Sequence, residues 1–122
     1  MEIESLAAVI RKILLEADRP LLNHQICERV FARTGEQTAY TSVRTACHIL
    51  RVRNEDPDRT LLSDVKKGYW YSSDDAEEVP RAIQQMDERL NKIQQARDAM
   101  HRNWMRRLEN TDRYERAKIL EQ

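Results

Sequence analysis

The sequence predicts a mainly helical protein of the α+β class, with three helices, one β-hairpin and a long C-terminal helix. Only two Gly and three Pro occur among its 122 residues, so the residues that typically end helices and form loops are scarce. Apolar residues recur at intervals of three and four before residue 54, and two short strand-like runs follow between residues 62 and 71. Between residues 81 and 110 there is neither Gly nor Pro. These observations set the order of the elements.

The first two helices are predicted from their apolar faces and their end signals. The first should end near Asp18, because Arg19 precedes Pro20 and a residue before proline disfavours the helical conformation. The second should begin with Asn23 as its N-cap and stop at Gly35. The apolar face of the first helix consists of Ile3, Leu6, Val9, Ile10, Ile13 and Leu14, and that of the second of Ile26, Cys27, Val30 and Phe31.

The third predicted helix lies within the segment YTSVRTACHILRVR, residues 40–53. Thr41 is expected to cap it. Its buried face should consist of Val43, Ala46, Cys47 and Leu50, which follow the i, i+3, i+4, i+7 pattern. The opposite face carries Ser42, Arg44, Thr45, His48 and Arg51. That face is either simply solvated or a contact surface.

A β-hairpin is predicted after the third helix. Residues 62–65 and 69–71 have strand-like composition, and Lys66, Lys67 and Gly68 lie between them. Glycine supplies the positive φ that a tight hairpin turn requires. The hairpin should therefore have a cationic tip, and at least one aromatic side chain among Tyr69, Trp70 and Tyr71 should belong to the core.

The composition changes after Ser73. We predict a domain at residues 1–73, an acidic connector at 74–80 and a helical dimerisation or interaction segment at 81–122, whose helix starts at Val79 or Pro80. Its coiled-coil seam, interrupted by the cation Arg97, consists of Ile83, Met86, Leu90, Ile93, Met100 and Trp104. Asp112 and Glu115 resemble a capping box, which predicts a separate short last helix carrying Tyr114, Ile119 and Leu120.

Residues 5–73 resemble a winged helix-turn-helix domain, most closely the HARE-HTH type. The resemblance rests on SLAAVIRKILLEADRPLLNHQICERVF, on TSVRTACHIL and on the ending LLSDVKKGYWYSS. It implies that the second and third helices form the helix-turn-helix, that the third is the recognition helix, and that the hairpin is the wing. The family is associated with DNA or chromatin targeting. No nuclease or polymerase module accompanies the domain in this chain, so no enzymatic role is inherited.

The resemblance and the local charge predict a small dimeric protein that binds double-stranded DNA and regulates transcription or another DNA transaction. Residues 37–54 contain three arginines, one histidine and no acidic residue. The residues expected to contact DNA are Ser42, Arg44, Thr45, His48 and Arg51 in the groove or on its edge, and Lys66 and Lys67 on phosphate. An alternative remains open: the domain binds a protein, as an antirepressor, inhibitor or assembly adaptor of phage or plasmid type.

The C-terminal helix has several interpretations. It either folds back on the N-terminal domain, pairs with a second copy, or binds another protein, and a pairing could be parallel or antiparallel. Thirty residues without a break extend on the order of 45 Å, which exceeds what the small domain can cover, and this favours a homodimer. The basic segment RDAMHRNWMRR, residues 97–107, could grip phosphates or an acidic partner, or be a solvated face.

Several function classes find no support in the sequence. The chain contains no glycine-rich phosphate loop, no nucleophile motif and no metal-ligand cluster, so we expect no catalytic residues, metal or cofactor. The net charge is zero, with 21 basic and 21 acidic residues, so DNA binding has to depend on local charge. No apolar run is long enough for a membrane span. Cys27 and Cys47 lie in apolar segments, which indicates buried free thiols in a protein of the reducing cytoplasm. For a bacterial or phage protein we expect association with the nucleoid.

Overall fold

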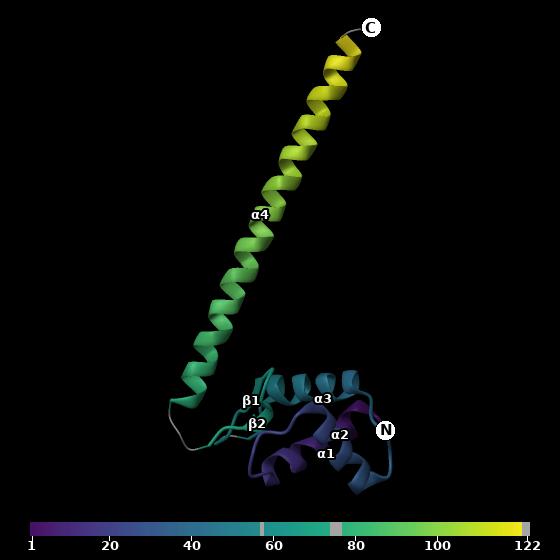
Figure 1. Cartoon of the computed structure of the whole chain (residues 1–122), viewed down its shortest axis with the longest axis vertical. Helices are drawn as coiled ribbons and strands as arrows, with labels where there is room; N and C mark the ends of the chain where they lie inside the picture. Colours follow the sequence, from purple (N-terminus) through teal and green to yellow (C-terminus); the bar gives the residue numbers. More distant parts are fainter. Residues whose placement is uncertain (57, 74–76, 121–122) are drawn as a thin grey trace. The chain divides into compact units, whose positions relative to one another are not determined.

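The computed structural model describes residues 1–56, 58–73 and 77–120. It confirms a mainly helical chain with a small antiparallel hairpin and a long C-terminal helix (Figure 1). The chain divides into two compact units, residues 1–82 and 83–122. Pro57 and the acidic pair Asp74–Asp75 lie outside the described residues. The elements are α1 (Ile3–Glu16), α2 (Asn23–Thr34), α3 (Tyr40–Arg53), β1 (Leu61–Asp64), β2 (Gly68–Tyr71) and α4 (Glu78–Leu120).

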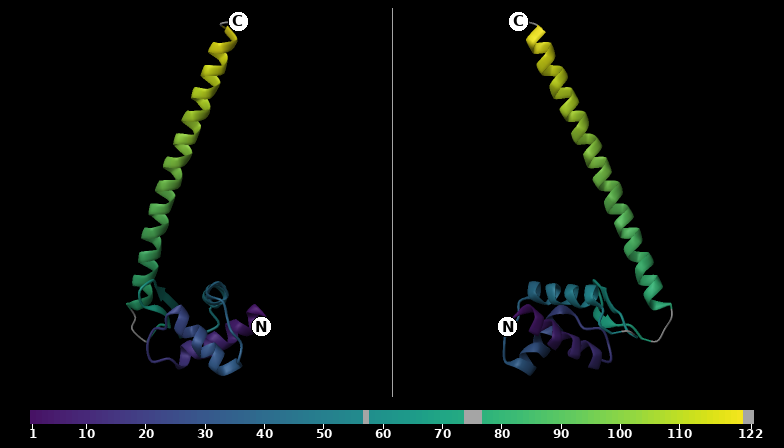
Figure 2. Two further views of the ribbon diagram at one scale, coloured as in Figure 1. Left: turned by 45° about the vertical axis from the view of Figure 1, so that its right-hand side comes forward. Right: turned by 180° about the vertical axis from the view of Figure 1, so that it is seen from behind.

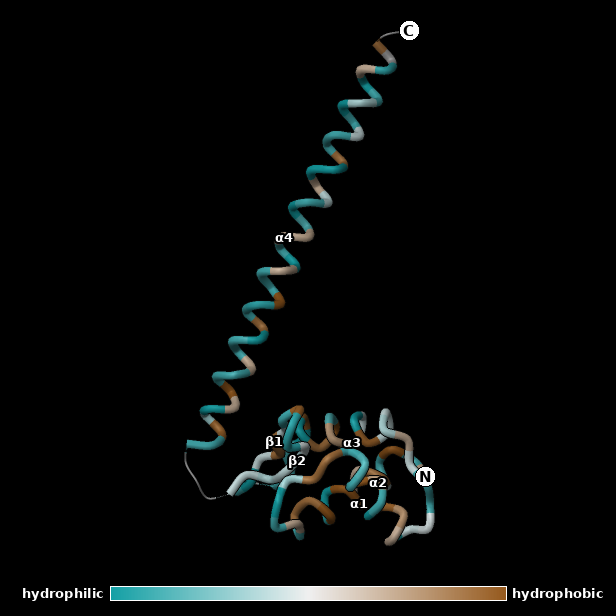
Figure 3. The backbone as a smooth tube through the Cα atoms, in the orientation of Figure 1, coloured by the Kyte–Doolittle hydropathy of each residue, from teal (hydrophilic) through white to brown (hydrophobic). Residues whose placement is uncertain are grey.

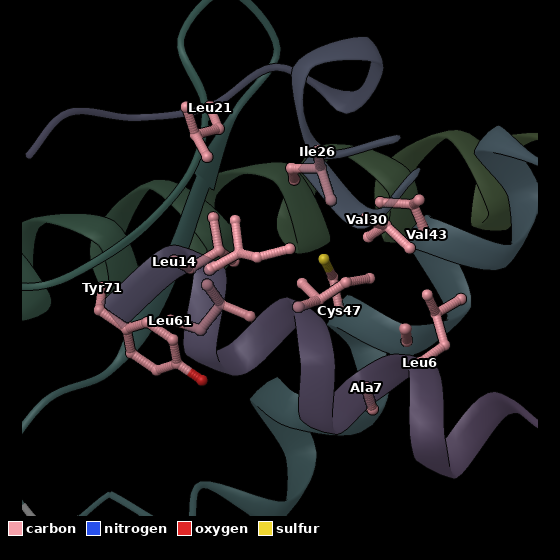
Figure 4. Close-up of a cluster of buried hydrophobic side chains, with 13 residues drawn as sticks. Leu6, Ala7, Leu14, Leu21, Ile26, Val30, Val43, Cys47, Leu61 and Tyr71 are labelled. Carbon is pink, nitrogen blue, oxygen red and sulfur yellow. The ribbon is translucent and has the colours of Figure 1, made fainter. Parts of the chain in front are cut away.

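Helices α1, α2 and α3 pack against one another in the N-terminal unit (Figures 1 and 2). Their apolar faces form one core. The packing between α1 and α3 is the most extensive contact between helices. Val43, Ala46 and Cys47 are buried and Leu50 packs half-buried against them, so the buried face predicted for α3 is confirmed. Figure 4 shows the cluster, whose members include Leu6, Ala7, Leu14, Leu21, Ile26, Val30, Leu61 and Tyr71.

The helix starts differ from the predicted ones by one or two residues. Leu22, not Asn23, is the N-cap of α2, and its N–H donates to Oε1 of Gln25 at 2.8 Å. The amide of Asn23 instead donates to the carbonyl oxygen of Tyr40 at 3.2 Å, across to the start of α3. Ala39, not Thr41, is the N-cap of α3, so the Thr41 hydroxyl already lies inside the first turn.

The helix ends follow their local signals more closely. Gly35 terminates α2 in the left-handed region, with φ 73°, as predicted. Helix α1 ends at Glu16, two residues before the expected Asp18. Asn54 terminates α3 with φ 45°, in the conformation that asparagine tolerates better than most residues.

The hairpin of β1 and β2 packs on the helical core through alternate side chains. Leu61 pairs with Tyr71, and both are buried. Leu21, in the segment between α1 and α2, adds a third short strand-like contact: its N–H and C=O pair with the C=O and N–H of Tyr69 at 2.9 and 2.8 Å. The hairpin is therefore held to the helices by backbone hydrogen bonds as well as by apolar packing.

The aromatic residues of β2 have three different surroundings. Tyr71 is in the core, and Tyr69 packs half-buried against it, so the expectation of a core aromatic is confirmed. Trp70 is half-buried, and its Nε1 donates to Glu78 at 2.6 Å, at the first residue of α4. Glu78 also accepts from the backbone N–H of Ser73 at 2.9 Å. The first turn of α4 is thus tied to β2 within the N-terminal unit.

Arg59 joins three segments just before β1. Its guanidinium donates to the carbonyl oxygens of Ser72 at 3.0 Å, Tyr71 at 3.3 Å and Leu15 at 3.5 Å. Leu15 lies in the last turn of α1, where carbonyl groups have no partner within the helix. The guanidinium carbon also lies 5.8 Å from the centroid of the Tyr71 ring. These contacts close the open end of the hairpin and attach it to α1.

We expect Arg59→Ala to lower the free energy of unfolding by about 2 kcal/mol, because the hairpin and α1 lose a charged donor to several carbonyl groups. Urea denaturation measures the loss. Arg29→Ala is the control, since Arg29 is exposed and forms no hydrogen bond or ion pair within the described part of the chain. The control should change stability by about 0.5 kcal/mol or less. Equal losses in the two variants would contradict the assigned role of Arg59.

Arg11 of α1 and Asp56 form a two-pronged ion pair that connects α1 to the loop after α3. The hydrogen bonds from Arg11 hold the pKa of Asp56 below its ordinary value of 3.8. A carboxylate with a lowered folded-state pKa contributes stability that is complete above its unfolded-state pKa. That contribution is lost as the pH falls below 3.8 through the lower pKa of the folded state.

Asp56→Asn is therefore expected to destabilise the protein at neutral pH and to make little difference in strong acid. Urea midpoints of the wild type and the variant, measured at neutral and at several acidic pH values, should converge below pH 3.8. Asp58→Asn removes an exposed aspartate that forms no ion pair with any described residue, and serves as the control. A difference that persists unchanged into strong acid would rule out the ion pair as its cause.

Helix α4 is a single helix from Glu78 to Leu120. The predicted separate last helix is wrong, because the chain stays helical through Asn110 and Thr111. The Thr111 hydroxyl donates to the carbonyl oxygen of Arg107 at 2.9 Å, one turn back within the continuing helix. Apolar positions recur along the hydrophilic helix in Figure 3. None of the helices in the described ranges has the length and apolar character needed to cross a membrane.

Candidate nucleic-acid interface

The buried face of α3 turns the predicted contact residues away from the core. Arg44, Thr45 and His48 are exposed, and Ser42 and Arg51 are half-buried. This arrangement follows from the helical repeat, because residues between the buried positions lie on the opposite side of the helix. The Thr45 hydroxyl donates to the carbonyl oxygen of Thr41 at 3.0 Å, so its oxygen remains available as an acceptor.

Arg51 links the exposed face of α3 to the hairpin. One terminal nitrogen of its guanidinium donates to the Ser63 hydroxyl of β1 at 2.5 Å. Its Nε and other terminal nitrogen make no hydrogen bond to the described residues. A side chain held at one nitrogen is partly ordered and keeps a pair of donors for a further acceptor.

A surface depression of about 500 Å³ lies where α2, α3 and the hairpin meet. Arg44 lines it, as do Asn23 and His24 of α2 and Ser63 and Asp64 of β1. The remaining lining residues are Leu22, Tyr40, Val65, Gly68 and Tyr69. The depression brings the N-terminal half of α3 and the hairpin onto one surface, which local sequence patterns cannot show.

The tip of the hairpin is organised by Asp64. One carboxylate oxygen accepts the backbone N–H groups of Lys66 at 2.7 Å and Lys67 at 3.1 Å. These hydrogen bonds, with a smaller contribution from the two ammonium groups, lower the pKa of Asp64. The turn is therefore fixed by an ionised carboxylate, and the exposed side chains of Lys66 and Lys67 extend from it beside Val65, which is 94% exposed.

Some cationic side chains of the N-terminal unit form ion pairs and others do not. Arg11, Arg33 and Arg53 form ion pairs with Asp56, Glu16 and Glu4, all of them acids from α1 or the loop after α3. In contrast, Arg44, Arg51, Lys66 and Lys67 form no ion pair with any residue that the structure describes. The same holds for four cations that lie outside α3 and the hairpin: Lys12, Arg19, Arg29 and Arg59. Arg44, Arg51, Lys66 and Lys67, all on α3 or the hairpin, are called the cationic surface below. None of its side chains forms an ion pair in the described part of the chain, but the Asp64 carboxylate lies at the hairpin tip and offsets part of the charge of Lys66 and Lys67.

The structure adds polar residues to this surface that sequence patterns did not assign to it: His24 and Asp64 line the depression, and so do Asn23, Tyr40 and Ser63. Asn23 lines the depression because its amide turns to the Tyr40 carbonyl group, whereas the sequence favoured a capping role. Tyr40 lines it as the first residue of α3, and Ser63 through its position on β1 opposite Arg51. Only the pairing register of the hairpin locates Ser63, and no local signal in the sequence predicts that position.

Within the residues that the structure describes, no group of three or more His, Cys, Asp or Glu side chains is placed to hold a metal ion. Comparison of the chain with protein-family models, with curated proteins and with solved structures gave no significant match.

Proposed function

We propose that this protein binds double-stranded DNA through α3 and the hairpin, and regulates transcription or another DNA transaction. The observation that carries the proposal is the cationic surface. Its four side chains have no acidic partner among the described residues, while three other arginines of the same unit do. A protein of zero net charge can attract DNA when its positive groups are segregated in this way.

In this proposal the N-terminal unit acts as a winged helix-turn-helix. Helix α3 enters the major groove, which is about 12 Å wide and accommodates a helix with its side chains. Arg44 and Arg51 donate to guanine edges or to phosphate, and Ser42, Thr45 and His48 contact neighbouring edges. Lys66 and Lys67 on the hairpin, which serves as the wing, bind phosphate as point charges.

The test is a titration of duplex DNA with wild type and Arg44→Ala/Arg51→Ala at several salt concentrations. The double variant should bind at least about tenfold more weakly, since each good arginine contact contributes about 1–3 kcal/mol. The slope of log K against log salt should also become shallower by about 2, because two fewer counterions are displaced.

Arg33→Ala/Arg53→Ala is the matched control, since it removes the same number of arginines and both are engaged with glutamates. Arg53 lies on α3 itself, so the control also tests whether the removal of any arginine from that helix weakens DNA binding. Equal weakening by both double variants would indicate non-specific attraction. Unchanged affinity and slope for Arg44→Ala/Arg51→Ala would exclude the cationic surface as the DNA contact.

The second candidate is a winged-helix domain that binds a protein. The balance of 21 basic and 21 acidic residues favours it, because a chain without net charge gains no long-range attraction to nucleic acid. An apolar protein interface loses little affinity when salt is added, whereas phosphate binding falls steeply. Retention of a host protein after nuclease treatment and at high salt would support this candidate over DNA binding.

A further inference from the structure

The C-terminal unit presents an apolar seam that no described part of the chain covers. Its side chains are largely exposed; Leu90, Ile93 and Met100, for example, are 62, 65 and 72% exposed. A polar helix gains little stability in isolation, since most helical stability comes from packing an apolar face. In heptad terms, alternating a and d positions fall at residues 83, 86, 90, 93, 97, 100, 104 and 107.

The seam fits another helix with the same spacing. Covering its six large apolar side chains would remove roughly 120 Å² of exposed surface from each, or about 700 Å² per chain. Two copies would then bury about 1,400 Å², within the range of stable protein interfaces. A second copy of this chain supplies a helix of matching length, spacing and apolar content, so the seam is self-complementary in size. Those six side chains are Ile83, Met86, Leu90, Ile93, Met100 and Trp104.

The charges along α4 distinguish the two orientations of such a pair. In a parallel pair each position meets itself, so Arg97 would face Arg97 and Arg107 would face Arg107 inside the seam. The segment 97–107, with four arginines, one histidine and one aspartate, would also lie beside the same segment of the second chain. Like charges held together at this range are destabilising. The parallel arrangement is therefore electrostatically unfavourable.

We propose that α4 pairs with α4 of a second copy in the antiparallel orientation, centred on residue 95. In that register the a positions of one helix lie level with the d positions of the other. The arginine-rich segment 97–107 then lies along segment 83–93, which is neutral and contains the acidic pair Asp87–Glu88. Glu88 comes level with Arg102 of the second copy.

Both arginines of the seam face an aliphatic side chain in this register. Arg97 packs its stem against isoleucine and extends its guanidinium to solvent, as long cationic side chains do at helix interfaces. Four of the six large apolar residues meet one another, and the two isoleucines are the residues that face the arginines. The layers on either side of the centre are Ile93 with Arg97, Leu90 with Met100, Met86 with Trp104, and Ile83 with Arg107, the second residue of each being from the other copy.

Disulfide trapping in the full-length chain tests both the partner and its direction. Leu90→Cys and Met100→Cys are made separately in a Cys27→Ser background, purified and mixed. Cys47 can stay, because its burial raises the pKa of the thiol to about 12 and keeps it unreactive. Gln95→Cys is the control, since it lies level with the centre of the pair but on the outer face of the helix.

The antiparallel pair predicts a disulfide only in the mixture, joining one chain of the Leu90→Cys variant to one chain of the Met100→Cys variant, with little linkage in either sample alone. Light scattering of the wild type at micromolar concentration should give twice the mass of the chain, and Gln95→Cys should not link. Linkage of Leu90→Cys to itself would show a parallel pair and overturn the proposal. A monomeric mass without linkage would overturn the second copy as the partner of α4.

Discussion

Gly68→Ala is expected to destabilise the N-terminal unit by about 4 kcal/mol or more, a large share of the stability of a small domain. Gly68 has φ 98°, a conformation that residues with a side chain rarely adopt. A Cβ atom there would lie 2.1 Å from the carbonyl oxygen of Leu21 and 2.7 Å from the nitrogen of Leu22. These are backbone atoms, and Leu21 is fixed by its two hydrogen bonds to Tyr69, so no flexible side chain can yield.

Gly35→Ala measures the cost of a side chain at positive φ without the steric contact with Leu21 that Gly68→Ala also introduces. Gly35 also has a positive φ, of 73°, but a Cβ atom there meets nothing within 4 Å. Its replacement should cost about 1 kcal/mol, the conformational penalty alone. Urea unfolding followed by Trp70 fluorescence, in a Trp104→Phe background, compares the two variants. Equal losses would mean that the close approach of Gly68 to Leu21 makes no contribution.

The helical core was predictable because the helical repeat determines which side chains share a face. Val43, Ala46 and Cys47 are buried at the positions that spacing alone assigns. Gly35 and Gly68 were predictable for a related reason: both mark places where the backbone has a positive φ that other residues avoid. These features depend on residues within one or two turns of each other, so the sequence contains enough information to locate them.

The helix starts were less predictable because they depend on distant contacts. Asn23 is a favourable capping residue, yet its amide is engaged by Tyr40, which is 17 positions away. Gln25 can then accept the N–H of Leu22, and the helix starts one residue earlier than the residue preferences suggest. The capping box predicted at Asp112 and Glu115 was wrong because no helix-breaking residue accompanies it, and the neighbouring Thr111 hydroxyl bonds within the continuing helix.

In the candidate interface, too, some features follow from the local sequence and others depend on distant contacts. Exposure of Arg44 and His48 follows from the helical repeat, whereas the distinction between paired and unpaired cations does not. Arg53 lies two residues after Arg51 on α3, but it pairs with Glu4, 49 positions away, while Arg51 bonds to Ser63. Local composition would treat the two arginines alike. Only the packing of α1 against α3 determines which of them is left for a ligand.

Ile10→Ala should produce the other large loss of stability, about 3–4 kcal/mol. Ile10 is completely buried in α1, the helix that packs most extensively against α3. Removing its outer carbons takes away apolar contact and leaves a cavity that a close-packed core fills only partly. Ile10→Val removes one methylene group at the same position and should cost about 1 kcal/mol. Urea denaturation of the two variants gives the comparison.

Ile10→Ala also separates stability from DNA affinity. Measured at a low temperature where the variant is still folded, its affinity for duplex DNA should stay close to that of the wild type, because the cationic surface is intact. Arg44→Ala/Arg51→Ala should behave in the opposite way, with weaker binding and a smaller change in stability, since Arg44 is exposed and Arg51 makes one hydrogen bond to Ser63. If Ile10→Ala weakens binding as much as the arginine double variant does, the affinity depends on the exact seating of α3 on α1, and the loss in the double variant cannot be assigned to direct contacts alone.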